Sequence, residues 1–191
     1  MLPIAVRIQP PARFRNQRLL AAVSAVLLVF CSLPAQTKAD SSAGSETLLP
    51  AADLAKVVPA TVFFRGQVAS VQIRNAAGVK MPDGMLVLSA LVDTSGYSTG
   101  VQEKYQAYFI TEVTLDVNGQ PLRPGAYGVG FVQDHFLVMD LGAHDLFTTH
   151  STHDTALKRP TPLQILADNT PGHWRLYVNR NYVVFSRSPG Q

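Results

Sequence analysis

Residues 112–141 read EVTLDVNGQPLRPGAYGVGFVQDHFLVMDL, and this stretch decides the fold class. Its runs of β-branched and aromatic residues are separated by Asn118-Gly119, by Arg123-Pro124-Gly125 and by Gln133-Asp134. Asn-Gly supplies the two residues with positive φ that a type I′ turn needs, and Pro-Gly favours a type II turn. The pattern therefore predicts a β-meander, and we expect its strands near the middle of a sheet.

The rest of the chain shows the same succession of short strand signals and turns. Met85–Val92 is continuously apolar, which indicates a central strand covered on both faces; a buried helix is the competing interpretation. From Tyr105 to Val117 every second residue is apolar or Thr, so we expect a long strand with a bend near Thr111. The remaining strands are expected at residues 61–65, 68–74, 162–167, 174–178 and 182–186.

The number of strand signals predicts an all-β fold. About nine short strands, Gly- and Pro-rich turns and at most one short N-terminal helix are typical of a single antiparallel β-sandwich or a partly closed barrel. The helix is expected within Leu48–Val58, with Leu54, Val57 and Val58 on its apolar side. Pro59 would end it, because proline cannot continue a helix.

The first 47 residues have the composition of an export leader followed by a spacer. Four arginines and no acidic residue precede the apolar run Leu19–Phe30, and Ala35 supplies a small residue for cleavage. We predict a signal peptide at 1–35, a flexible linker at 36–47 and a β-sandwich domain at 48–191. The expected protein is exported, periplasmic or extracellular, with no stable membrane span after cleavage; a retained N-terminal anchor is the alternative.

The position of the one cysteine argues against a lipid anchor, and the charge balance argues against a nucleic-acid partner. Phe30 stands directly before Cys31, where a bacterial lipoprotein signal needs a small residue, so we do not expect lipidation. The chain has 16 Lys and Arg against 13 Asp and Glu, and loss of the four leader arginines leaves 12 against 13. A nucleic-acid partner needs a concentrated basic face, which this balance does not provide.

The segment Gly119–Tyr127 reads GQPLRPGAY and fits the pattern G-x-x-L-x-P-G-x-Y. It resembles a hairpin of exported bacterial β-sandwich proteins for which no activity is assigned. The resemblance implies a structural role, in which the glycines and the proline shape turns while Leu122 and Tyr127 fill the core. It therefore implies no catalytic residues.

Three of the five histidines lie in the polar segment Gly142–Arg159, which we expect to be a loop. They are His144, His150 and His153, and the nearby acidic residues are Asp140, Asp145 and Asp154. Imidazole and carboxylate groups bind zinc, iron and copper, so a transition-metal cofactor in a small metal-dependent enzyme is one hypothesis. The alternative is a solvated loop. The other two histidines are expected at an edge or a turn, at His135 and His173.

The loop Gly96-Tyr97-Ser98-Thr99-Gly100 fits the G-x-S-x-G pattern of a nucleophilic serine. Such a serine needs a strand before it and a helix after it inside an α/β sheet. An Asp and a His from residues 140–153 would supply the chain order of a hydrolase triad. The segment after the loop alternates as a strand, however, and no βαβ unit is predicted, so we expect a polar loop without a nucleophile.

Tyrosines that cluster on a concave sheet face are a third kind of candidate, because such faces hold sugars or peptides. The five are Tyr97, Tyr105, Tyr108, Tyr177 and Tyr182, and packing in the core is the alternative. The leader, the near-neutral mature charge and the lack of a clear catalytic constellation favour a non-catalytic binding or interaction module. Its expected partner is a carbohydrate, a peptide or an envelope component. A purely structural envelope component, which predicts stable self-association, is a third class.

Overall fold

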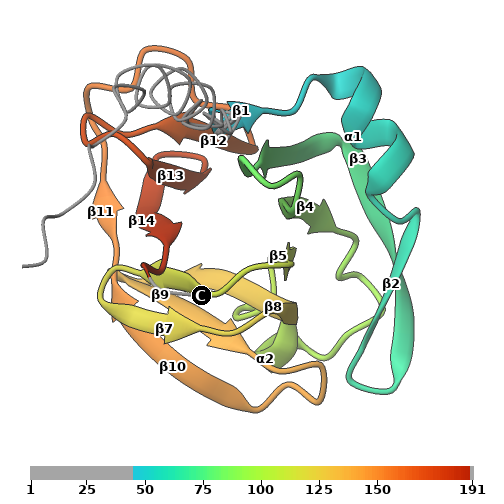
Figure 1. Ribbon diagram of the computed structural model, residues 1–191. Helices are drawn as coiled ribbons and strands as arrows, with labels where there is room; N and C mark the ends of the chain where they lie inside the picture. The colour runs from blue at the N-terminus through green and yellow to red at the C-terminus, as the bar shows by residue number, and fades with distance from the viewer. Residues whose placement is uncertain (1–44, 190–191) are drawn as a thin grey trace, which may run out of the picture. The chain divides into compact units, whose positions relative to one another are not determined.

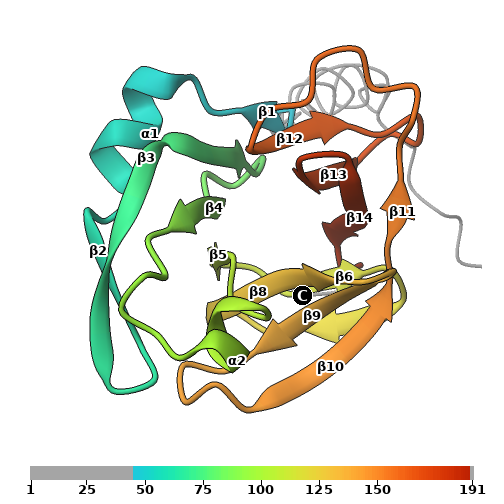
Figure 2. The same ribbon diagram turned by 180° about the vertical axis from the view of Figure 1, so that it is seen from behind.

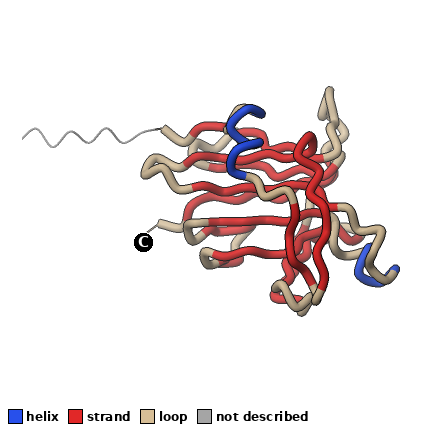
Figure 3. Tube along the Cα trace, turned by 90° about the vertical axis from the view of Figure 1, so that its right-hand side faces the viewer, coloured by secondary structure: helices blue, strands red, loops and turns tan. Residues whose placement is uncertain are grey.

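The computed structural model describes residues 45–189, which contain fourteen β-strands and two short helices (Figure 1). The predicted signal peptide, its cleavage site and most of the linker lie outside the described residues. The strands form two antiparallel sheets, so the predicted all-β sandwich is confirmed. The first and last described residues lie at the same end of the sandwich (Figure 3).

Sheet 1 contains eight strands in the order β1-β3-β4-β5-β8-β9-β10, with β2 paired to β3 off this path. Their bounds are β1 (Thr47–Leu48), β2 (Thr61–Phe64), β3 (Gln67–Lys80), β4 (Leu86–Val92), β5 (Ala107–Thr111), β8 (Gly125–Val132), β9 (His135–Met139) and β10 (Asp145–His150). Sheet 2 contains six strands in the order β12-β13-β14-β6-β7, with β11 paired to β14. Their bounds are β6 (Leu115–Val117), β7 (Gln120–Leu122), β11 (Thr152–His153), β12 (Leu163–Ala167), β13 (His173–Val178) and β14 (Asn181–Arg187).

The two sheets face each other across the main hydrophobic core. Sheet 1 contributes Val87, Phe109 and Val129 to it, and sheet 2 contributes Trp174 and Phe185. The rings of Phe109 and Phe185 meet edge to face with centroids 6.1 Å apart. The sequence pattern of the closing hairpin β13–β14 predicts burial of Trp174 and Tyr182. Trp174 is buried in this core, whereas Tyr182 remains partly exposed.

The alternating segment 105–117 crosses from one sheet to the other. Its odd-numbered residues are all buried, as the alternation predicts. They do not all share one face, because Tyr105 precedes β5 and packs in a cluster separate from the main core that Ala107 and Phe109 join. The chain leaves β5 at Thr111 and enters β6 at Leu115, and the Thr111 hydroxyl donates to the carbonyl of Val113 at 2.6 Å. The bend expected near Thr111 is thus the point where the strand changes sheets.

The meander predicted for residues 112–141 is wrong as a single sheet. Asn118 and Gly119 have φ values of 50° and 87°, as a type I′ turn requires, and they join β6 to β7 in sheet 2. The chain then returns to sheet 1 for β8 and β9, and Gly125 does not have the positive φ of the expected type II turn. As a result, Leu122 of β7 and Val129 of β8 fill the core from opposite sheets.

Two other expectations have clear outcomes. Leu86–Val92 form β4 between β3 and β5, with Val87 in the main core and Leu88 against the short helix α1 (Ala51–Val57) on the opposite face. Met85, the first residue of the predicted strand, lies before β4 and is 45% exposed. The predicted central strand and N-terminal helix are therefore confirmed. Val57, expected on the apolar side of α1, is instead 41% exposed.

The prediction that segment 142–159 is a loop is wrong, because the segment contains β10 and β11. β10 is an edge strand without a buried residue, so its sequence lacks the alternation that identifies a half-buried strand. A second helix, α2 (Thr99–Gln102), was also not predicted, since four residues are too few for a helical period.

An outer layer covers the face of sheet 1 that is turned away from the main core (Figure 2). It consists of the β2–β3 hairpin and of residues 93–106, which include α2. Phe64 of β2 stacks on Tyr105 with ring centroids 3.8 Å apart, and the Tyr97 hydroxyl donates to the Phe64 carbonyl at 3.1 Å. Gly128 and Gly130 of β8 lie beneath this layer and leave the room that it occupies.

We expect Gly130→Ala to destabilise the protein by at least about 2 kcal/mol, because the core can absorb the added methyl group only by moving backbone. A Cβ at this position would lie 1.9 Å from the carbonyl oxygen of Lys104. Gly100→Ala is the matched control, since a Cβ there meets nothing within 4 Å. Urea unfolding of both variants measures the difference, and equal stabilities would contradict the prediction.

Candidate functional site

The structure places the three loop histidines in three separate positions. His144 lies in the β9–β10 turn with Nδ1 2.9 Å from Asp140 Oδ2, and His153 of β11 has Nδ1 2.7 Å from the side-chain oxygen of Asn181. His150 ends β10. In residues 45–189 no group of three or more His, Cys, Asp or Glu is placed to hold a metal ion.

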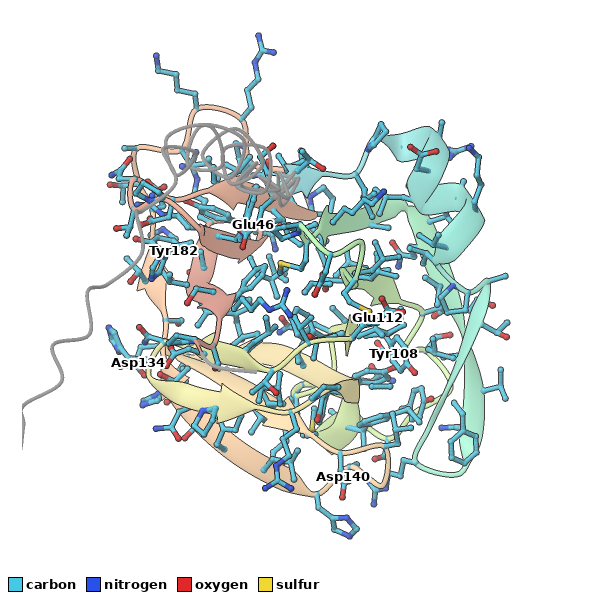
Figure 4. All side chains as sticks on the ribbon, in the orientation of Figure 1. Glu46, Tyr108, Glu112, Asp134, Asp140 and Tyr182 are labelled. Carbon is cyan, nitrogen blue, oxygen red and sulfur yellow. The ribbon has the colours of Figure 1, made fainter. Side chains whose placement is uncertain are left out.

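His150 instead pairs with a histidine outside the predicted set. It lies opposite His135 in the β9–β10 register, and the two rings meet edge to face at 6.2 Å. The Asp134 carboxylate is 2.7 Å from Nδ1 of His135 and 3.9 Å from Nδ1 of His150. Figure 4 shows Asp134 well apart from Asp140, so this pair is remote from His144.

Residues 96–100 serve the packing of the outer layer. Tyr97 is buried there, and Ser98 precedes α2 in an ordinary extended conformation with φ −62° and ψ 153°. A nucleophile elbow instead holds its serine in a sharp, strained turn between a strand and a helix of an α/β sheet. Asp140, one of the proposed partners, is bound by the backbone N–H and the ring of His144, which lower its pKa.

The five tyrosines do not share one face. Tyr97 and Tyr105 are buried in the outer layer, and Tyr108 is half-buried on β5 of sheet 1. Tyr177 and Tyr182 lie on sheet 2 with ring centroids 4.9 Å apart, and Figure 4 shows Tyr182 well apart from Tyr108. The aromatic face is therefore reduced to one pair, of which only Tyr182 is accessible.

The outer face of sheet 2 presents a row of three polar side chains that we call the polar row. Ser186 of β14 lies opposite His173 of β13 and also opposite Asp116 of β6. Four of their neighbours along the strands, Leu115, Val117, Trp174 and Phe185, point into the core. Since side chains alternate along a strand, the three members of the polar row point away from the core, about 4.8 Å apart from strand to strand.

Two adjoining hollows border the polar row, and we call them together the polar groove. The first has a volume of about 210 Å³, and the second has a volume of about 570 Å³. Asp116, His173 and Ser186 line both. The walls are completed by Glu46, Asn118, Gly119, Pro171, Gly172, Val184, Phe185, Arg187 and Pro189. The second hollow alone, and the two combined, lie within the range of about 300–1,000 Å³ that is typical of small-molecule sites.

The polar groove is rich in hydrogen-bond acceptors. His173 Nδ1 is 3.1 Å from the carbonyl of Pro171, which can only accept, so the neutral ring holds its proton on Nδ1 and offers Nε2 as an acceptor. The carboxylate of Asp116 accepts from the backbone of Gly119 at 2.7 Å and keeps further lone pairs free. Glu46 adds a second carboxylate, which accepts from the Trp174 indole at 2.6 Å (Figure 4).

Positive charge in and beside the groove is neutralised by carboxylates. Arg187 lies 2.6 Å from Asp83 and lowers the pKa of that carboxyl. Arg175 occupies the next position along β13 on the same face, between Asp168 at 2.5 Å and the ring of Tyr182 at 4.8 Å. The groove therefore suits a ligand that brings donors rather than an anion.

Further contacts hold the neighbouring part of this face. The Tyr177 hydroxyl donates to Asp154 at 2.9 Å, which lowers the pKa of that carboxyl, while burial raises the pKa of Tyr177. Arg180 donates to three carbonyls of the following loop, those of Asp154, Thr155 and Leu157. This end of sheet 2 is thus covered, and the polar groove lies at the other end.

Sequence reasoning missed the polar row because its members come from three strands far apart in the chain. His173 was expected only as a turn or edge residue, and neither Asp116 nor Ser186 was a candidate. The outward direction of each side chain follows from the alternation along its strand. The pairing of β14 with β6, which brings the three together, has no signal in the sequence.

No protein-family model, no curated protein and no solved structure matches the chain. Within residues 45–189 no helix is long and apolar enough to cross a membrane. Function must therefore be inferred from the chemistry of the polar groove.

The contribution of the Asp168 carboxylate, which lies beside the groove, to the stability of the fold can be tested. Its pKa is lowered by the backbone N–H of Thr170 and by Arg175. Because the pKa is lower in the folded than in the unfolded chain, the ionised carboxylate stabilises the fold at pH values above 3.8, the ordinary pKa. This stabilisation is lost as the pH falls through the lower pKa of the folded state. We expect Asp168→Asn to be less stable than wild type at pH 7 and to lose less stability between pH 4 and pH 2.

Urea unfolding across this pH range measures the effect. Asp53→Asn is the control, because Asp53 pairs only with Lys56 on the exposed side of α1. An Asp168→Asn variant that follows the wild-type pH profile would show that this carboxyl does not stabilise the fold.

Proposed function

We propose that the protein is an exported, non-catalytic binding module that holds carbohydrate in the polar groove. The observation that supports this most directly is the polar row itself. Three hydrogen-bonding side chains from three adjacent strands point into two adjoining hollows of about 210 and 570 Å³. Convergent polar groups in a concave site are the usual basis of ligand orientation.

The same three residue types occur in hydrolase triads, but their order here favours binding. In a triad the histidine lies between the serine and the acid, so that the acid orients the ring. Here Ser186 lies between His173 and Asp116, and the carbonyl of Pro171 orients the ring instead. Among the hydrogen bonds of the described residues none joins Ser186 to His173.

Carbohydrate fits the groove better than a peptide does. Sugar hydroxyls are donors along the whole length of a chain, and the groove offers acceptors on Asp116, Glu46 and His173 together with the Ser186 hydroxyl. An extended peptide is most often held by the open backbone of a strand edge. The polar row lies on a sheet face instead, where its side chains face the ligand.

Export is supported by the N-terminal sequence. The basic segment, the apolar run Leu19–Phe30 and Ala35 have the order of a signal peptide. The predicted mature chain has no cysteine and can form no disulfide, so its stability depends on the apolar core even in an oxidising compartment. A carbohydrate-binding module in the periplasm or outside the cell would encounter envelope or environmental glycans.

We expect the purified chain to bind at least one member of a panel of neutral and amino-sugar oligosaccharides in isothermal titration calorimetry. The double variant His173→Ala/Ser186→Ala should weaken this binding about tenfold or more, since each lost hydrogen bond contributes about 0.5–1.5 kcal/mol. Asp116→Asn should also weaken it, because the amide retains one acceptor oxygen and loses the charge.

Thr148→Ala is the control, since it removes a hydroxyl from β10 of sheet 1, whereas the polar row lies on sheet 2. Absence of binding to every oligosaccharide at millimolar concentration would overturn the proposal. So would binding that the double variant leaves unchanged, or binding of a lysine-rich peptide alone.

A further inference from the structure

Within residues 45–189, the edge strand β2 has a neighbouring strand on one side and none on the other. It pairs with β3 through a hairpin in which Phe64 lies opposite Gln67, and the turn residues Arg65 and Gly66 have φ values of 48° and 81°. In such a two-residue hairpin the residues flanking the turn bond to each other, and every second residue does so after them. Thr61 and Phe63 therefore direct their backbone N–H and C=O groups away from β3.

Neighbouring contacts support this alternation and limit the open stretch. Ala60 accepts from the backbone N–H of Val71 at 2.9 Å, as the residue before Thr61 should. Arg65, the next outward residue after Phe63, donates to the carbonyl of Leu141 at 2.7 Å. Among the described residues no hydrogen bond involves the outward backbone groups of Thr61 and Phe63.

The side chains beside this open edge are apolar and exposed. Phe63 is 53% exposed and Val68 is 66% exposed, and the two lie directly opposite each other in the hairpin. Natural edge strands are usually protected from pairing by charged residues, proline or a bulge. The four residues of β2 are Thr, Val, Phe and Phe, so none of these protections is present within the strand.

The hairpin is held in place by its inner face. Phe64 is fully buried and stacks on Tyr105, and the side-chain amide of Gln67 donates to the carbonyl of Gly96 at 3.2 Å. The open edge is therefore preorganised, and a partner strand would not have to order it.

We propose that β2 pairs antiparallel with β2 of a second copy of this chain, giving a two-fold symmetric dimer. With Val62 on the symmetry axis, Thr61 lies opposite Phe63 of the second copy, and Phe63 lies opposite its Thr61. This register uses both open residues of each copy in four backbone hydrogen bonds. It brings the exposed Phe63 and Val68 side chains of both copies onto one face.

A second copy fits this edge better than an unrelated peptide does. Only two residues are open, so any partner strand gains at most four backbone hydrogen bonds. A second copy adds an equal set of exposed apolar side chains to them, on the same face and at the matching positions. The Arg65 residues of the two copies lie at opposite ends of the paired strands, so their charges do not meet.

Sedimentation equilibrium of the purified chain between 10 µM and 1 mM tests the proposal, because a short interface of this kind gives a weak and concentration-dependent dimer. Phe63→Lys and Thr61→Pro should each weaken dimerisation at least tenfold. Thr61→Pro removes an N–H that points away from β3, so it leaves the hairpin bonds in place. Leu146→Lys is the matched control, since Leu146 is 49% exposed on the edge strand β10.

Amide hydrogen exchange provides a second measurement that needs no variant. The amides of Thr61 and Phe63 should exchange more slowly as the concentration rises, while that of Leu146 should not change. A wild-type chain that stays monomeric at 1 mM overturns the proposal. So does a dimer that persists in Phe63→Lys and Thr61→Pro, or one that only Leu146→Lys disrupts. Loss of oligosaccharide binding bears only on the polar groove and leaves this proposal unaffected.

Discussion

The close approach of the outer layer to β8 is the constraint on which much of the structure depends. A Cβ on Gly128 would lie 2.4 Å from the Phe64 ring, and a Cβ on Gly130 would lie 1.9 Å from the Lys104 carbonyl. The alternating glycines of β8 thus remove side chains from one face of a central strand and let an aromatic stack and a backbone segment fill the space. Because β8 lies between β5 and β9, the same two positions affect three strands of sheet 1.

This arrangement makes the two outer faces of the sandwich unlike. Sheet 1 is covered by α1 on one part and by the β2–β3 hairpin with residues 93–106 on the other. Among residues 45–189 no helix packs against sheet 2, and the loop fixed by Arg180 covers one end of it. Polar residues that alternate with core residues on β6, β13 and β14 consequently remain accessible, and the polar row is formed where these strands pair. The groove is therefore a consequence of covering one sheet and leaving the other open.

The sequence predicts local features of this fold well and their combination poorly. The alternation from Tyr105 to Val117, the Asn118-Gly119 turn and the burial of Trp174 follow from side-chain periodicity and from the φ preferences of turn residues. The change of sheet at Thr111 appears in the sequence only as a place where a bend fits.

The polar row depends on long-range pairing, which periodicity does not encode. Asp116 and Ser186 are neighbours only because β14 pairs with β6 across about seventy residues of sequence, and β10 leaves no hydrophobic pattern because it is exposed at an edge. The short spacing of His144, His150 and His153 favours a shared metal site, yet in the structure the three have different partners. Residues that lie near each other in the sequence are thus a poor guide to a site built from adjacent strands.

The proposed groove and the proposed dimer edge belong to different sheets, and this separation matters for how they would act together. β2 lies on one side of the molecule and β14 lies on the other (Figures 1 and 2). Pairing through β2 would leave both polar grooves accessible and would place two of them on one particle. A repeating glycan that reached both grooves would bind the second one intramolecularly, at the effective concentration set by their fixed spacing. Weak single-site binding and weak dimerisation would then reinforce each other, because a glycan that spans two grooves stabilises the dimer by the same free energy by which the dimer strengthens glycan binding.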